Sequence, residues 1–180
     1  VMQSMRLGAS FFGSRGQFIA ENTDLISDKI VLTRSKKHGY FQPFPKDKIV
    51  GDGIYNKMPR DQRELSEAQT LNYKVTISES NGIVEVEVEI NGTEHVPVSL
   101  EMSFRKGGEL SGVTANKNTK GSYFLEEGMG QYKVGKDVIK FGPGAVTHKW
   151  AEMRGMLPKQ NGNSVYITGY TPFKHTVELS

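Results

Sequence analysis

The sequence predicts an all-β protein, an antiparallel β-sandwich of jelly-roll type with about a dozen short strands. The first observation is a pair of segments around Asn81-Gly82 in which apolar and polar residues alternate at every step. The second is a series of short apolar runs after residue 105 that glycine, proline or asparagine separates. The third is composition, because 20 glycines, 7 prolines and a hydrophobic fraction of 36% suit strands and turns better than helices.

Residues 71–90 form the most regular stretch and predict a β-hairpin. Asn81-Gly82 suits a two-residue type I′ turn, because both residues tolerate positive φ. The glutamates of the second strand then form a solvated outer face. The predicted cross-strand pairs are Val75–Val88 and Ile77–Val86 on one face, and Lys74–Glu89 and Thr76–Glu87 on the other.

A third strand is expected at 96–104, after Asn91-Gly92. A two-residue loop would mix apolar and polar faces, whereas a three-residue loop restores an apolar pairing with the preceding strand. Pro97 then points outward, which suggests an edge strand because proline cannot donate to a ladder. The expected pairs are Val88–Val96 and Val86–Val98.

The remaining elements complete a single sandwich domain over residues 1–180, with a less regular part at 1–58 and a strand-rich part at 71–180. Residues 59–69 fit either a short helix capped by Asp61 or an exposed polar loop. N-terminal strands are expected at 6–12, 17–21 and 28–34, followed by a loop with proline and aromatic residues at 38–45. Later strands are expected at 109–115, 122–127, 130–134, 137–141, 146–152, 164–169 and 174–179.

Composition limits the classes of function. Lys and Arg number 23 against 20 Asp and Glu, a net charge of +3, and the charges are interspersed, so we expect no nucleic-acid partner. The absence of cysteine excludes disulfides, thiolate nucleophiles and cysteine zinc sites. No apolar run approaches the roughly 20 residues that span a bilayer, so we expect no membrane span. The chain opens on Val1, which suggests a processed protein or a piece of a longer one.

The stretch 140–150, which contains Gly-Pro-Gly and His148, looks most like a site. Residues 122–148 as a whole, with two hairpin-like turns followed by Gly-Pro-Gly and His148, resemble the second half of a cupin barrel, in which such a histidine binds a metal. The family also needs two histidines and a carboxylate upstream, and residues 111–122 contain no histidine. We therefore expect no metal and no cofactor, and interpret His148 as a capped or solvent-facing residue. A cupin-like barrel that binds a small molecule stays as an alternative.

Aromatic residues and arginines supply the candidate ligand-binding residues. Aromatic rings stack on the apolar faces of sugars, while neighbouring polar groups bind the hydroxyls. Trp150 shares a predicted strand face with Val146 and His148, which favours burial in the core over binding. Arginine forks suit the carboxylate or sulfate groups of an acidic glycan, although a network of surface ion pairs is the simpler explanation. The candidates are Tyr40, Phe44, Arg60, Arg63, His148, Trp150 and Tyr170.

Three segments, at 96–110, 122–144 and 164–179, resemble the β-sandwich domains that accompany bacterial polysaccharide lyases and glycoside hydrolases, the heparinase II/III group among them. The resemblance includes no catalytic motif, so no catalytic residue is assigned and we do not expect this chain alone to be an enzyme. It implies an extracellular or periplasmic domain that binds a polysaccharide or oligosaccharide, or that packs against a catalytic domain N-terminal to this chain. A structural or protein-interaction domain is the third hypothesis.

Overall fold

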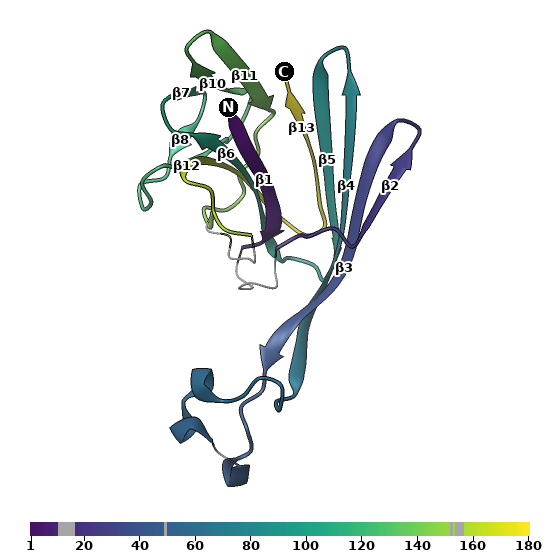
Figure 1. Ribbon diagram of the computed structural model, residues 1–180, viewed down its shortest axis with the longest axis vertical. Coiled ribbons are helices and arrows are strands. Elements are labelled where there is room, and N and C mark those ends of the chain that lie inside the picture. The colour runs from purple at the N-terminus through teal and green to yellow at the C-terminus, as the bar shows by residue number, and fades with distance from the viewer. Residues whose placement is uncertain (11–16, 49, 152, 154–156) are drawn as a thin grey trace.

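The computed structural model describes residues 1–10, 17–48, 50–151, 153 and 157–180 (Figure 1). Within this part of the chain the strands form two sheets, and the only helical segments are short 3₁₀ turns. The predicted all-β sandwich is confirmed. The 3₁₀ turns are η2 (Lys46–Lys48), η3 (Gly51–Gly53) and η4 (Tyr55–Lys57).

The two sheets differ in size. The smaller has five strands in the order β1-β6-β12-β9-β8, antiparallel except for the parallel pair β9 and β12. Its strands are β1 (Met2–Ala9), β6 (Pro97–Arg105), β8 (Thr114–Ala115), β9 (Ser122–Phe124) and β12 (Gly162–Tyr170). The larger has eight antiparallel strands in the order β2-β3-β4-β5-β13-β11-β10-β7. Its strands are β2 (Asn22–Ile26), β3 (Lys29–Phe41), β4 (Leu65–Ser80), β5 (Ile83–Gly92), β7 (Glu109–Ser111), β10 (Gly130–Val134), β11 (Asp137–Gly142) and β13 (Phe173–Leu179).

The β4–β5 hairpin has the predicted register, and all four predicted pairs are present. Asn81 and Gly82 have φ values of 53° and 78°, as a type I′ turn requires. On the outer face, Lys74 Nζ lies 3.3 Å from Glu89 Oε1. The hairpin therefore follows from local turn chemistry together with two chemically matched faces.

The predicted pairing of β5 with β6 is wrong. β5 pairs with β4 and β13, whereas β6 lies between β1 and β12 in the smaller sheet. The chain crosses from one sheet to the other before Pro97, and the N–H of His95 donates there to the carbonyl of Thr171 at 2.8 Å. Both strands alternate because each has one face on the shared core, so alternation does not reveal which sheet a strand joins. Pro97 is the first residue of β6, an interior strand, so the expected edge strand is also wrong; proline is tolerated at the first position of a strand.

Three other predicted elements differ from the structure. The expected strand at 17–21 is limited to a bridge between Gln17 and Gly8, and β2 begins instead at Asn22. Residues 59–69 form no helix, because the chain turns and then enters β4. The expected strand at 146–152 is reduced, in its described residues, to a bridge at Val146. The expected strand at 6–12 corresponds to β1 as far as Ala9, and residues 11–12 lie outside the described residues.

The main core lies between the two sheets. Phe104 of β6 packs on Tyr132 and Phe141 of the larger sheet, with ring centroids 5.1 Å and 4.8 Å away. Gly130 lies opposite Phe141, and a Cβ there would lie 2.4 Å from the phenyl ring. Further fully buried members of this core include Leu71, Ile90, Val98, Met102, Leu125, Val165, Ile167 and Val177.

The larger sheet extends beyond the smaller one at β2 and β3 (Figure 1). One cross-strand row joins Leu25, Ile30, Ile77, Val86 and Val177. The exposed fraction along this row falls from 75% at Leu25 to 0% at Val177. The sandwich core therefore thins out towards this edge.

β3 and β4 continue beyond the sandwich as a two-stranded ribbon (Figure 1). β2 begins opposite Thr33 and β5 ends opposite Leu71, so among the described strands neither pairs with the ribbon and it has no third strand. A β-bulge lies in the ribbon between His38 and Gly39. The far end carries residues 42–64, which we call the β3–β4 excursion.

Candidate functional site

Three of the predicted site residues meet at one end of the smaller sheet. Residues 145–151 run alongside β12, where Val146 forms a parallel bridge to Thr168. This places two aromatic side chains of the segment beside the last residue of β12. We call this cluster the aromatic platform, and its members are His148, Trp150 and Tyr170.

His148 is the buried member of the platform, and both of its ring nitrogens have backbone partners. Nε2 lies 3.1 Å from the carbonyl of Val98 and 3.0 Å from that of Gly169, while the N–H of Trp150 donates to Nδ1 at 3.3 Å. Nδ1 is thus the acceptor, so Nε2 carries the hydrogen of a neutral ring. Burial lowers the pKa of His148, and the two carbonyls offset only part of that effect. His148 is a capped structural residue, and neither nitrogen has a lone pair free for a metal.

Trp150 and Tyr170 form the exposed part of the platform. Their exposed fractions are 48% and 37%, and their rings are 6.4 Å apart at an interplanar angle of 88°. The Trp150 ring also lies 5.2 Å from His148. The carbonyl of Trp150 accepts a hydrogen bond from Ser99 Oγ at 3.1 Å. The planes of the two large rings are therefore nearly perpendicular, and hydrogen bonding of the Trp150 backbone fixes the position of the tryptophan.

The interpretation that favoured burial of Trp150 is wrong. It assumed a strand in which Val146, His148 and Trp150 share one face, but the segment is irregular after Val146. Ala151 is buried in a second, smaller apolar cluster, which it forms with Phe124 and Tyr166. His148 and Ala151 are both buried although they lie three residues apart, so burial does not alternate here and Trp150 lies at the surface between them.

The β3–β4 excursion contains Arg63, whose exposed fraction is only 7%. Its Cζ lies 4.3 Å from the ring centroid of Tyr55 and 5.5 Å from that of Phe41. Nε donates to the carbonyl of Pro59 at 3.3 Å, whereas the buried Nη1 has no hydrogen-bond partner. The Tyr55 hydroxyl donates to the carbonyl of Phe41 at 2.7 Å, which fixes the ring under the guanidinium.

A hollow of about 430 Å³ adjoins Arg63, and the predicted candidate Phe44 also lines it. Arg60 is exposed and Tyr40 has an exposed fraction of 63%, but neither lines the hollow. No ion pair among the described residues involves Arg60 or Arg63, so the expected network of surface ion pairs is absent from that part of the chain. The full lining is Gln42, Pro43, Phe44, Pro45, Lys48, Gln62, Arg63 and Glu64.

Sequence reasoning missed a buried charge cluster on the outer face of the smaller sheet. Glu101 of β6 has no exposed surface, and its two oxygens accept from Arg6 Nε at 3.1 Å and Arg6 Nη2 at 2.7 Å. The hydroxyls of Tyr166 and Ser103 donate to the same carboxylate at 2.7 Å and 2.9 Å. The signal was a glutamate at the centre of an otherwise apolar and serine-containing strand, which no motif singles out.

Glu101 is a satisfied carboxylate and not a general base. Burial alone would raise its pKa, but the hydrogen bonds from Arg6, Tyr166 and Ser103 and the charge of Arg6 outweigh burial and hold the pKa below its usual value. Burial and the adjacent carboxylate raise the pKa of the Tyr166 phenol. A neighbouring cavity of about 300 Å³ is lined by Arg6, Asn116, Thr119, Ser122, Ala151, Met153, Lys159 and Tyr166.

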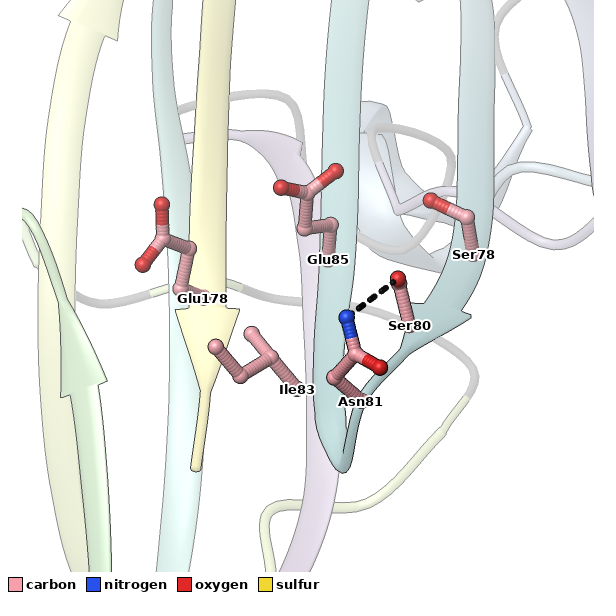
Figure 2. A pocket seen from close by; sticks show the side chains of 6 residues that line it. All are labelled: Ser78, Ser80, Asn81, Ile83, Glu85 and Glu178. Carbon is pink, nitrogen blue, oxygen red and sulfur yellow. Dashed lines mark hydrogen bonds between the residues drawn. The ribbon is translucent and has the colours of Figure 1, made fainter.

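Figure 2 shows an open hollow at the turn end of the β4–β5 hairpin, on the solvated outer face of the larger sheet. Glu85 and Glu178 lie opposite each other on neighbouring strands, and Asn81 Nδ2 donates to Ser80 Oγ at 3.4 Å. Both glutamates are exposed, as predicted for the outer face at Glu85. Among the described residues no group of three or more acidic, histidine or cysteine side chains could hold a metal ion.

Comparison of the chain with protein-family models, with curated proteins and with solved structures finds no match in any of the three. In the described part of the chain, no helix has the length and apolar character required to cross a membrane. The aromatic platform and the hollow beside Arg63 are the two candidate ligand-binding features of the described structure.

Proposed function

We propose that this chain is a non-catalytic carbohydrate-binding β-sandwich domain whose aromatic platform stacks on a sugar ring of a polysaccharide or oligosaccharide. The observation that carries the proposal is the exposure of 48% of Trp150 on a backbone that is hydrogen-bonded on both sides. Exposed aromatic rings that gather in one place can mark a ligand-binding site, and sugars present apolar C–H faces that match such rings.

The geometry of the platform suits one sugar ring rather than a flat protein surface. Trp150 offers a ring face, and Tyr170 stands at 88° to it, so a ligand stacked on one ring meets the edge or hydroxyl of the other. The buried ring of His148 lies close to both, with its centroid 5.2 Å from that of Trp150 and 5.1 Å from that of Tyr170. Rings that are already fixed lose little conformational freedom on binding, which favours affinity.

The non-catalytic part of the proposal is supported by the hydrogen bonding of two buried titratable groups, Glu101 and His148. Glu101 accepts four hydrogen bonds, and His148 is neutral with both nitrogens engaged, so neither is placed to exchange a proton with a ligand. The cupin-like alternative is less favoured because its one histidine ligand is occupied. An accompanying catalytic domain and an extracellular or periplasmic location stay predictions.

The test is tryptophan fluorescence across neutral, uronic-acid and sulfated oligosaccharides. Trp150 is the single tryptophan of the chain, so its emission reports on the platform alone. We expect a saturable change with one class of sugar, and a Kd at least about tenfold weaker in Tyr170→Ala, because aromatic anchors dominate such contacts. Leu25→Ala is the control, since Leu25 is exposed at the remote β2 edge. Calorimetric binding that is unchanged in both Tyr170→Ala and Trp150→Ala would refute the proposal.

A further inference from the structure

The β3–β4 excursion holds a buried positive charge without an anionic partner in the described structure. We propose that the hollow beside Arg63 binds the carboxylate or sulfate group of an acidic oligosaccharide, which makes acidic glycans the ligand class of this domain. The identity of the ligand as a glycan rests on the proposed function, whereas the oxyanion site at Arg63 is testable without the aromatic platform.

The first argument is the incomplete coordination of Arg63. The residue is 7% exposed, and its guanidinium has one hydrogen bond from Nε to the carbonyl of Pro59 and none at the buried Nη1. A guanidinium has five N–H donors in a planar fork, and burial removes the water that would otherwise accept from them. The faces of Tyr55 and Phe41 offset part of that loss but accept no conventional hydrogen bond. An oxyanion bound in the hollow, which Arg63 lines, supplies an acceptor to the guanidinium.

The second argument is the chemistry of the wall. Arg63 and Lys48 bring two positive charges and Glu64 one negative, so the described lining has a net charge of +1. Gln42 and Gln62 add amide donors, and Phe44 with its flanking prolines adds an apolar wall. A volume of about 430 Å³ lies within the range of about 300–1,000 Å³ that is usual for small-molecule sites. A lining that combines cationic and amide donors with apolar side chains matches an acidic sugar unit.

The competing explanation is that Arg63 only clamps Tyr55 and Phe41. A clamp predicts no response of the guanidinium to anions and no effect of the neighbouring Glu64 on binding. The oxyanion site predicts both, because a carboxylate in the lining repels an incoming anion. The two explanations therefore differ in whether Glu64 affects binding.

The experiment observes the Arg63 Nε–Hε signal by NMR of protein labelled with 15N-arginine. Three probes are titrated into the wild type and into Trp150→Ala, namely glucuronate, glucose 6-sulfate and glucose. We expect the Arg63 signal to move saturably with one or both acidic probes in both proteins, and to stay in place with glucose. The probe that moves it separates a carboxylate source from a sulfate source. An Arg63 signal that ignores both acidic probes, or that moves equally with glucose, would overturn the inference.

Two variants sharpen the result without removing Arg63. Glu64→Gln removes the negative charge of the lining and should tighten the Kd for the acidic probe by about three- to tenfold. Arg60→Gln is the matched control, because Arg60 lies three residues from Arg63, is exposed and does not line the hollow, so its Kd should stay within about twofold. Weaker binding in Glu64→Gln contradicts the inference. An Arg63 response without any Trp150 fluorescence change would sink the platform proposal alone.

Discussion

Replacement of Glu101 by glutamine tests whether the buried ion pair holds the outer face of the smaller sheet together. The variant keeps the shape of the side chain but removes the charge to which Arg6, Tyr166 and Ser103 donate four hydrogen bonds. Arg6 then retains a buried positive charge whose side chain is 4% exposed and has no counter-ion in the described structure. The NH2 group of the new amide also faces N–H or O–H groups that donate to the carboxylate in the wild type.

The magnitude follows from the burial of both partners. Removal of one member of a buried pair costs about 3–5 kcal/mol. Glutamine keeps one acceptor oxygen, so we expect the lower end, about 3 kcal/mol of the free energy of unfolding. At about 2–4 °C per kcal/mol for a chain of this size, Tm falls by about 6–12 °C. Loss of this size is a large share of the roughly 5–15 kcal/mol that stabilises a typical domain.

The assay is urea unfolding followed by circular dichroism and tryptophan fluorescence. Glu127→Gln is the matched control, because Glu127 is exposed beside a turn and should change the free energy of unfolding by less than about 0.5 kcal/mol. The double variant Arg6→Met/Glu101→Leu should recover much of the loss, since no charge is then left buried. If Glu101→Gln is as stable as Glu127→Gln, the carboxylate is solvated and the reasoning about this cluster is refuted.

Three further predictions concern pH, the platform and the ribbon. The pKa of Glu101 is lower in the folded protein than in the unfolded chain. The stability that its ionised form contributes is therefore complete above the unfolded pKa and is lost as pH falls through the folded pKa. The urea midpoint should accordingly depend less on pH, between pH 3 and pH 7, in Glu101→Gln than in the wild type. His148→Ala removes the acceptor of the Trp150 N–H and the Nε2 contact with the Val98 and Gly169 carbonyls, so it should cost about 1–3 kcal/mol in urea unfolding and red-shift the tryptophan emission, whereas the exposed neighbour variant Thr147→Ala should do neither. Gly39→Ala places a Cβ 1.7 Å from the Ser66 carbonyl oxygen and should speed amide exchange in the ribbon, whereas Gly82→Ala meets no atom within 4 Å and should cost only about 1 kcal/mol.

Local chemistry allowed the hairpin at 71–90 to be predicted pair by pair. The turn residues, the alternation and the cross-strand charges all point to one register there. The same reasoning failed at Asn91-Gly92, where the chain leaves one sheet for the other. A strand that covers a shared core alternates in the same way whichever sheet it joins, so the sequence signal was equal for both arrangements.

The candidate site was predicted in part. Side-chain type selected the three platform residues, which the fold brings together from segments about twenty residues apart. Exposure could not be inferred, because it depends on where the strand pattern stops after Val146. Arg63 was a candidate because its guanidinium can bind an oxyanion, but it was expected at the surface. Its burial depends on contacts with Tyr55 and Phe41, which come close to Arg63 only when β3 and β4 pair.

The two-stranded ribbon has a thermodynamic consequence for whatever binds at its tip. Isolated hairpins are marginally stable in water, so the ribbon and the excursion can open as a subglobal unit while the sandwich stays folded. The affinity of the Arg63 hollow is then the intrinsic affinity multiplied by the fraction of molecules in which this unit is closed. A ligand that closes it would slow amide exchange along β3 and β4 as far as Leu71, where β5 joins the sheet. Substitutions in the ribbon would thereby change the affinity of the hollow without contacting the ligand.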